Sequence, residues 1–290
     1  MGCGWTRLKA RLAFCVSPAP IVEIHDVSSD AIGIFDSGIG GLTVLHCLVR
    51  LLPSEHLIYL GDTARAPYGT KSAKVVTEYA LDNADFLAEK GIKLLVVACN
   101  SASAVALDAL AERCAFPVVG VVEPGARAAA RGTRNGKVGV IGTEATIASG
   151  AYSRALRTLR ADLEVYTRAC PLFVPLAEEG WVDNEVARQT AALYLSSLAA
   201  SGIDTLILGC THYPLLKGVI GSFFGPTVTL VDSAQETALV VKERLAEHGL
   251  LRRAGEGGTS FFVTDVPDRF VRVGQRFLGE RVESAVRIER

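Results

Sequence analysis

Short runs of apolar residues alternate along this chain with segments of helical periodicity. Continuous apolar runs, unlike strict apolar–polar alternation, are typical of strands buried on both faces of a parallel sheet. The pattern predicts eight such strands: Ala31–Phe35, His56–Leu60, Leu94–Ala98, Val118–Val121, Lys137–Ile141, Leu163–Thr167, Thr205–Gly209 and Val228–Val231. It also predicts six helices: Gly41–Leu51, Ser72–Glu89, Ala102–Ala111, Thr146–Arg160, Asn184–Ala200 and Ala234–Glu247, the last closed by Gly249. The fold class expected is α/β, with mostly parallel sheets flanked by helices.

A weak internal repeat divides these elements into two halves. Ile32–Ser37 resembles Val138–Thr143, and Cys99 and Cys210 are separated by nearly the same interval as the two repeats. We therefore expect two pseudo-symmetric domains with one of these cysteines each and the active site in the cleft between them. Chance likeness among apolar strands is the alternative explanation.

Polar sequence near Glu123–Gly125 and Asp232–Ala234 marks the expected crossings between the halves. The predicted division is an N-terminal extension over residues 1–30, a first domain from 31–122 plus 235–290, and a second domain from 123–234.

Cys99 and Cys210 each end a predicted strand and are followed by polar residues. Open α/β sheets bind ligands at this edge, and a helix N-terminus there favours a thiolate. Two thiols facing each other across a small molecule can remove a proton from one face of a carbon and return it to the other, one acting as base and one as acid. His212 can supply or take up the balancing proton. Buried structural cysteine is the alternative for both positions.

Two turns after other predicted strands also carry candidate chemistry. Asp36–Gly41 is rich in glycine, and its N–H groups can hold a carboxylate or phosphate, but its spacing is not that of a dinucleotide site. Asp36 can orient a cysteine or accept its proton, or it can cap the following helix. Tyr68 and Gly69 lie in a turn that is either structural or in contact with the ligand. Arg65 could bind a carboxylate, although a single arginine is more often solvated.

Composition narrows the function classes. The 290 residues are 49% hydrophobic, and 30 basic and 31 acidic residues leave a net charge of −1. This balance argues against nucleic acid or an anionic membrane as a partner, and no apolar run approaches the roughly 18 residues that span a bilayer. Seven scattered cysteines suggest free thiols in a reducing compartment, with Cys47, Cys114 and Cys170 as buried structural ones. A secretion signal in the first thirty residues is a rival interpretation, but its apolar part is short.

The sequence lacks the motifs expected for zinc binding, thiol redox chemistry, serine hydrolysis or nucleotide binding. A zinc site from Cys99, Cys210 and His212 has no evident fourth ligand and no short cysteine spacing. The chain contains no Cys-x-x-Cys redox motif, no Gly-x-Ser-x-Gly elbow and no phosphate-binding loop with a Lys-Ser/Thr pair.

Together these segments resemble the glutamate racemases of the cofactor-independent aspartate/glutamate racemase superfamily. The resemblance runs from about Ala31 to the C-terminal helices and is specific only as a set. The matching segments are Gly33–Thr43, Gly61–Thr63, Pro67–Gly69, Ala98–Ser103, Gly142–Thr146, Cys170–Leu176 and Leu208–Leu215. Ser101 departs from the family, which most often has threonine there, and the N-terminal extension lies outside the shared core.

The resemblance implies a role for each matched residue. Cys99 would deprotonate D-glutamate with help from Asp36, and Cys210 would deprotonate L-glutamate with help from His212 and Glu178. The substrate-binding positions that it implies are Asp36, Ser37, Tyr68, Gly69, Asn100, Ser101, Thr143, Thr146, Thr211 and His212.

It further implies a cytoplasmic enzyme, without metal or pyridoxal phosphate, that supplies D-glutamate for peptidoglycan and so for cell shape. The resemblance leaves two partners open: a second copy of the chain in a homodimer, and a cell-wall precursor as effector. A racemase for aspartate and a non-catalytic amino-acid binder on the same scaffold are the rival functions.

Overall fold

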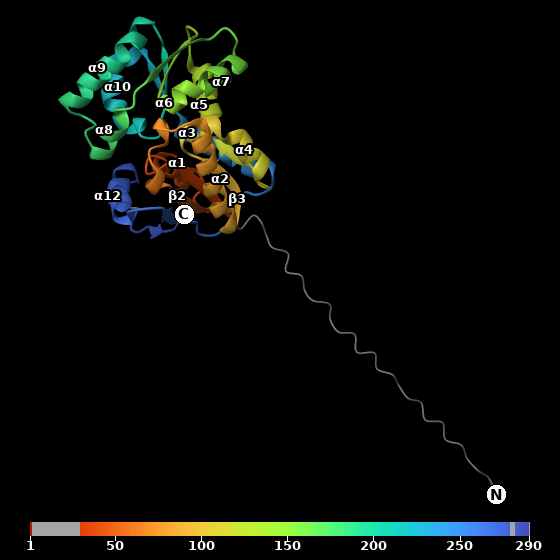
Figure 1. The fold of residues 1–290 in the computed structure, drawn as a ribbon. Coiled ribbons are helices and arrows are strands. Elements are labelled where there is room, and N and C mark those ends of the chain that lie inside the picture. The colour runs from red at the N-terminus through yellow and green to blue at the C-terminus, as the bar shows by residue number, and fades with distance from the viewer. Residues whose placement is uncertain (2–29, 279–281, 290) are drawn as a thin grey trace.

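Two α/β lobes make up the computed structural model, which describes residues 1, 30–278 and 282–289 (Figure 1). The first lobe is built on a six-stranded sheet in the order β10-β9-β2-β1-β3-β4, and the second lobe on a four-stranded sheet in the order β6-β5-β7-β8. Every pairing within the two sheets is parallel, which confirms the predicted fold class. The predicted extension over residues 1–30 lies outside the described residues except at its two end positions.

The helices and strands follow one another in α/β alternation. The strands are β1 (Ala31–Asp36), β2 (His56–Gly61), β3 (Ile92–Val97), β4 (Val118–Gly120), β5 (Lys137–Gly142), β6 (Glu164–Ala169), β7 (Thr205–Gly209), β8 (Thr229–Asp232), β9 (Gly258–Val263) and β10 (Val286–Arg287). The α-helices are α1 (Leu42–Leu51), α2 (Ala73–Glu89), α3 (Asn100–Val105), α4 (Leu107–Arg113), α5 (Val122–Gly132), α6 (Glu144–Ser149), α7 (Ala151–Leu159), α8 (Phe173–Glu179), α9 (Glu185–Ala200), α10 (Lys217–Phe224), α11 (Ser233–Glu247) and α12 (Pro267–Leu278).

The two sheets repeat the same strand order. β2-β1-β3-β4 of the first lobe corresponds to β6-β5-β7-β8 of the second, so the repeated segments β1 and β5 occupy equivalent places. Cys99 follows β3 and Cys210 follows β7, which are also equivalent strands. In each sheet the strand order reverses between the repeated strand, β1 or β5, and the strand that precedes the cysteine, β3 or β7. Such switch points are where open α/β sheets bind ligands. The predicted internal repeat is thus confirmed.

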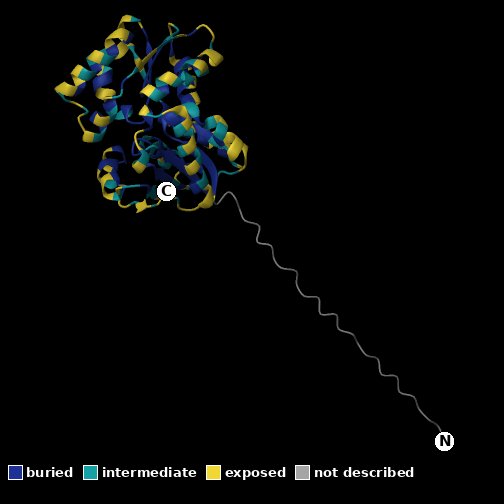
Figure 2. Ribbon diagram, in the orientation of Figure 1, coloured by how far each residue is buried: buried dark blue, intermediate teal, exposed yellow. Residues whose placement is uncertain are grey.

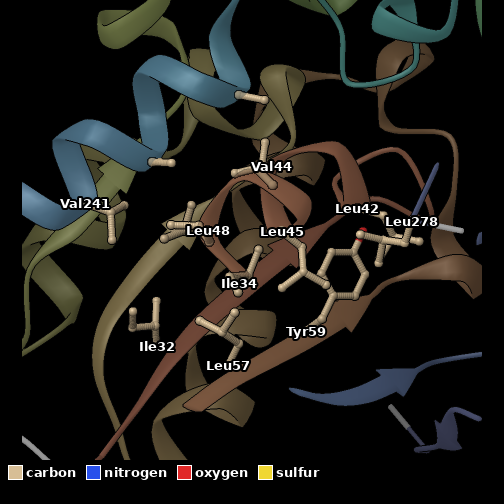
Figure 3. Packing of buried hydrophobic residues seen from close by; sticks show 14 of the residues in the cluster. Ile32, Ile34, Leu42, Val44, Leu45, Leu48, Leu57, Tyr59, Val241 and Leu278 are labelled. Carbon is tan, nitrogen blue, oxygen red and sulfur yellow. The ribbon is translucent and has the colours of Figure 1, made fainter. Parts of the chain in front are cut away.

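Buried residues gather on the strands and on the inward faces of the helices, while the outer helix faces are exposed (Figure 2). Ile32 and Ile34 of β1 point toward α1, where Leu45 and Leu48 meet them, and Val241 of α11 packs beside them (Figure 3). The other face of the sheet packs against α2 and α3 through a second cluster. Because helices cover both faces, the central strands are mostly apolar, and this is why they were predictable from the sequence.

Three expected elements differ from the structure. The helix predicted over Ala102–Ala111 is two helices, α3 and α4, which meet at Ala106. The helix predicted over Thr146–Arg160 is likewise α6 and α7, because Gly150 between them adopts φ 65°, a left-handed conformation that interrupts a helix. Glu123–Gly125 is not a crossing turn but the start of α5, where a proline is tolerated in the first turn. Gly249, with φ 67°, does follow the end of α11 as predicted.

The C-terminal β9 and α12 were not predicted, and they complete the first lobe beside the site. Thr264 and Asp265, which follow β9, bond to the loop after β2. Thr264 Oγ1 donates to Asp62 Oδ1 at 3.0 Å, and Thr63 Oγ1 donates to the Asp265 carbonyl at 2.6 Å. These bonds join residues about two hundred positions apart, and they place α12 against the second lobe.

A buried ion pair lies in the first lobe away from the cleft. Lys93 Nζ lies 2.6 Å from Glu55 Oε2, and their side chains are 0% and 1% exposed. Replacing Lys93 alone by Met leaves a buried carboxylate without its cation, so we expect the free energy of unfolding to fall by about 3–5 kcal/mol in urea titrations. Adding Glu55→Gln should recover most of this loss, because the amide oxygen can still accept from Arg252 N as Glu55 Oε1 does at 2.8 Å. A single-variant loss below about 1 kcal/mol would contradict the prediction.

Candidate active site

Cys99 lies at the end of β3 as the residue that precedes α3, and it is buried. Burial and the neighbouring Asp36 carboxylate raise the pKa of its thiol to about 12, although hydrogen bonds from Ala102 N and from Ser37 oppose the shift. The expectation that the helix N-terminus favours a thiolate here is therefore wrong. α3 has only six residues, and its effect is smaller than that of desolvation. Cys99 is a neutral thiol at neutral pH and can serve as a proton donor.

Cys210 follows the equivalent strand of the second lobe, and its neighbour is a histidine–glutamate pair, His212 and Glu178. Its Sγ lies 3.8 Å from His212 Nδ1, and His212 Nε2 lies 3.2 Å from Glu178 Oε1. The element that follows is a short 3-10 helix, Tyr213–Leu216, and not the α-helix start expected after the strand. Here a charged side chain takes the place of a helix N-terminus next to the thiol.

His212 is an imidazolium at neutral pH. Burial disfavours its charge, but hydrogen bonds with Cys210 and Glu178 outweigh burial and raise its pKa to about 10. The same hydrogen bond lowers the pKa of Glu178. His212 can therefore donate a proton to the Cys210 sulfur through Nδ1, while Glu178 holds its other nitrogen.

The raised pKa of His212 links stability to pH. The folded-state pKa of about 10 lies above the ordinary value of 6.5, so the folded protein binds the proton more tightly than the unfolded chain. The contribution of His212 to the free energy of unfolding should be full below pH 6.5 and should be lost as the pH rises through about 10. Urea unfolding across this range should show the decline in the unaltered protein and less of it in His212→Asn. Equal slopes would show that other groups cause it.

Asp36 ends β1 beside Cys99. Its Oδ2 accepts a hydrogen bond from Gly38 N at 2.9 Å, and its Oδ1 is buried with no hydrogen-bond partner among the described residues. Burial raises the pKa of this carboxyl, while the charge of His212 and backbone N–H groups oppose the rise. The alternative role as a helix cap does not apply, because Gly41 precedes α1 and no side chain of the described residues caps it. An unpartnered buried oxygen leaves Asp36 able to accept a proton.

Three hydroxyl groups meet where the lobes touch. Ser101 Oγ lies 2.9 Å from Thr143 Oγ1 and 3.3 Å from Thr146 Oγ1, and the two threonine oxygens are 3.0 Å apart. Thr143 also caps α6 by accepting from Thr146 N. The serine that departs from the family pattern thus keeps the hydroxyl contact across the cleft.

Tyr68 is held by a network behind the loop that carries it. Its hydroxyl donates to Asp62 Oδ2, and Asn83 Nδ2 donates to the same hydroxyl at 3.1 Å. Arg65 is partly exposed, and its guanidinium bonds carboxylates of its own lobe, Asp62 at 2.7 Å and Asp82 at 2.8 Å. Asp62 is a residue that sequence analysis did not single out, although it belongs to the Gly61–Thr63 segment of the family resemblance.

A cavity of about 40 Å³ lies between the lobes and brings most predicted site residues together. It has room for roughly three water molecules, which is less than an amino acid needs, so the lobes are closed on each other. Asp36 and Thr146 lie behind its wall, hydrogen-bonded to wall residues. The predicted residues that line it are Ser37, Tyr68, Gly69, Cys99, Asn100, Ser101, Thr143, Glu178, Cys210, Thr211 and His212. Gly38, Ala66, Pro67 and Val174 also line it and were not predicted.

Helix α12 closes one side of this site. Arg269 Nη2 lies 3.0 Å from Glu178 Oε2, Arg276 donates to the Glu178 carbonyl, and the Phe277 ring meets the His212 ring edge-on at 5.6 Å. No signal in the sequence connects these residues, because the contact depends on how the two lobes face each other.

Comparison with known proteins identifies the family to which this fold belongs. The Asp/Glu/Hydantoin racemase family matches residues 32–241. A glutamate racemase of Geobacter metallireducens is 62% identical over 253 residues, which cover 87% of this chain and 94% of that protein. A glutamate racemase from Thermus thermophilus in complex with β-chloro-D-alanine superposes with a TM-score of 0.83 at 52% identity, covering 90% of this chain and 98% of that one. The Escherichia coli glutamate racemase with L-glutamate and the activator UDP-MurNAc-Ala has a TM-score of 0.74 at 30% identity, with 90% and 98% covered.

The fold and the site define a two-lobed α/β enzyme with acid–base groups from both lobes around one cavity. The chain belongs to the Asp/Glu/hydantoin racemase family, and it is therefore an isomerase that acts on a stereocentre. Among the helices of residues 30–278 and 282–289, none has the length and apolar character needed to cross a bilayer.

Proposed function

We propose that this racemase interconverts L- and D-glutamate by proton transfer at the α-carbon, with Cys99 and Cys210 as the two acid–base groups and no cofactor. The observation that carries the proposal is that both thiols, at equivalent strand ends of two repeated sheets, line one small cavity. The likeness to proteins named as glutamate racemases supports glutamate as the substrate.

In the L-to-D direction, the Cys210 thiolate removes the α-proton and the Cys99 thiol delivers its own proton to the opposite face. The neutral state of Cys99 suits this role. In the reverse direction, Cys99 first gives its proton to Asp36, whose Oδ1 has no other partner in the described structure. His212 gives a proton to Cys210. The Cys99 thiolate then removes the α-proton, and the Cys210 thiol delivers its proton to the opposite face.

The intermediate carries negative charge on the α-carboxylate, which needs fixed donors in a site without water. The hydroxyls of Ser37, Thr143 and Thr211 and the amide of Asn100 lie in the cavity wall. Hydrogen bonds from such groups can hold both carboxylates of glutamate without an arginine.

By the same resemblance we propose a cytoplasmic role in supplying D-glutamate for peptidoglycan and cell shape, and a cell-wall precursor as effector. We further propose that the lobes are domains with the predicted boundaries, residues 31–122 plus 235–290 and residues 123–234.

Circular dichroism of purified protein with D-glutamate and no added cofactor tests the proposal, because racemisation removes the optical signal. We expect kcat/KM for D-glutamate to exceed that for D-aspartate by at least about tenfold, since a shorter side chain leaves its binding groups unpaired. A higher kcat/KM for D-aspartate would show that glutamate is not the preferred substrate. Binding of glutamate without loss of the optical signal would indicate a non-catalytic binder.

A further inference from the structure

Tyr152 of α7 connects the two lobes beside the proposed site. Its hydroxyl lies 2.6 Å from Asn100 Oδ1 and 3.1 Å from Ser233 Oγ, and all three side chains are buried. The single phenol proton is donated to the amide oxygen, so Ser233 donates to the phenol oxygen. Asn100 directly follows Cys99 and lines the cavity, whereas α7 packs on the sheet of the second lobe.

The ring of Tyr152 fits against two glycines. A Cβ on Gly209 would lie 3.0 Å from its Cε2 atom, and a Cβ on Gly125 would lie 3.5 Å from its Cε1 atom. Gly209 directly precedes Cys210. Tyr152 therefore contacts the cysteine segment of the second lobe with its ring and that of the first lobe with its hydroxyl.

We propose that Tyr152 is a positioning residue that orients the Asn100 amide and sets the spacing of the two cysteine segments in the closed cleft. Because Oδ1 of Asn100 is held by the phenol, the Nδ2 group is left to donate into the cavity, where a carboxylate of the substrate would accept. Without the phenol proton the amide can rotate and present its oxygen, which repels a carboxylate. This inference rests on the proposed function.

A double-mutant cycle of Tyr152→Phe and Asn100→Ala tests it. Tyr152→Phe removes one hydroxyl, and we expect kcat/KM for D-glutamate to fall about tenfold, the scale of one positioned hydrogen bond. If Tyr152 acts through Asn100, the same change should have no further effect in the Asn100→Ala protein, so the two effects are not additive. Additive losses would overturn the inference, because they would show that Tyr152 acts by another route.

Tyr194→Phe is the matched control. It also removes a phenol hydrogen bond in the second lobe, the one accepted from Leu172 N at 3.2 Å, but it lies outside the cavity wall. Its kcat/KM should be unchanged, and an equal loss in this control would overturn the inference by showing a general effect of such substitutions. If Tyr152→Phe does not fold, Ser233→Ala takes its place in the cycle, with the same non-additivity expected.

The activity of the unaltered protein distinguishes a failure of the proposed function from a failure of the inference about Tyr152. If it does not turn over either enantiomer of glutamate, the proposed function fails and the inference fails with it. If it racemises glutamate while the cycle is additive, only the role of Tyr152 is overturned.

Discussion

Cys99→Ala and Cys210→Ala are each expected to lower racemisation in both directions by at least about 10³-fold, the scale of a positioned acid–base group. The loss must be shared by both directions, because enantiomers have equal free energy in water and the equilibrium constant is one. For any variant kcat/KM is therefore the same from L and from D. Circular dichroism from each enantiomer measures it, and full activity in either variant would contradict the two-thiol assignment.

Exchange of the α-proton with solvent deuterium distinguishes the roles of the two thiols. In Cys210→Ala, Cys99 can still remove the α-proton of D-glutamate and return it to the same face. In deuterium oxide we expect deuterium at the α-carbon of recovered D-glutamate without conversion to L. Cys99→Ala should do the same with L-glutamate only. Exchange of both enantiomers by a single variant would show that the remaining thiol reaches both faces.

Cys114→Ala is the matched control for these variants. Cys114 follows α4 in the first lobe, is half-buried and lies outside the cavity wall. Its loss should leave racemisation unchanged, so inactivity of this variant would point to oxidation or misfolding and not to the chemistry at Cys99.

The central strands were predictable from the sequence because burial on both faces makes them mostly apolar. β1 and β3 are buried at every residue, whereas β9 is exposed at Gly258–Ser260 and its apolar residues are few. β10 covers the outer side of β9 only at Phe262 and Val263, so the rest of β9 has one neighbouring strand and a weaker apolar pattern than the central strands, and for this reason it was missed.

The contacts between the lobes could not be predicted from local pattern. Arg269 meets Glu178, and Tyr152 meets Asn100, only because two separately folded sheets face each other in one arrangement. The electrostatic environment of Cys99 also depends on the tertiary structure. The sequence places the thiol at a helix start, but only the structure shows that it is buried beside the Asp36 carboxylate.

Gly40→Ala should lower kcat/KM by about 10²-fold with little change in stability. Gly40 belongs to the first lobe, and a Cβ there would meet Thr211 Oγ1 and lie 2.5 Å from His212 Nδ1 in the second. This overlap can be relieved by opening the cleft or by moving His212 away from Cys210. Either response displaces an acid–base group by about an ångström, a change that can cost this much.

The neighbouring glycine distinguishes this effect from a general loss of packing. A Cβ on Gly41 would lie 2.6 Å from Asp36 Cβ and 3.0 Å from Ala98 Cβ, both in its own lobe, and opening the cleft cannot relieve that overlap. Gly41→Ala should therefore lower the melting temperature, whereas Gly40→Ala should keep it and lose activity. Gly218→Ala, where a Cβ meets nothing within 4 Å, should change neither. If Gly40→Ala unfolds as readily as Gly41→Ala, the two lobes do not separate as independent bodies, and closure of the cleft is part of the fold itself.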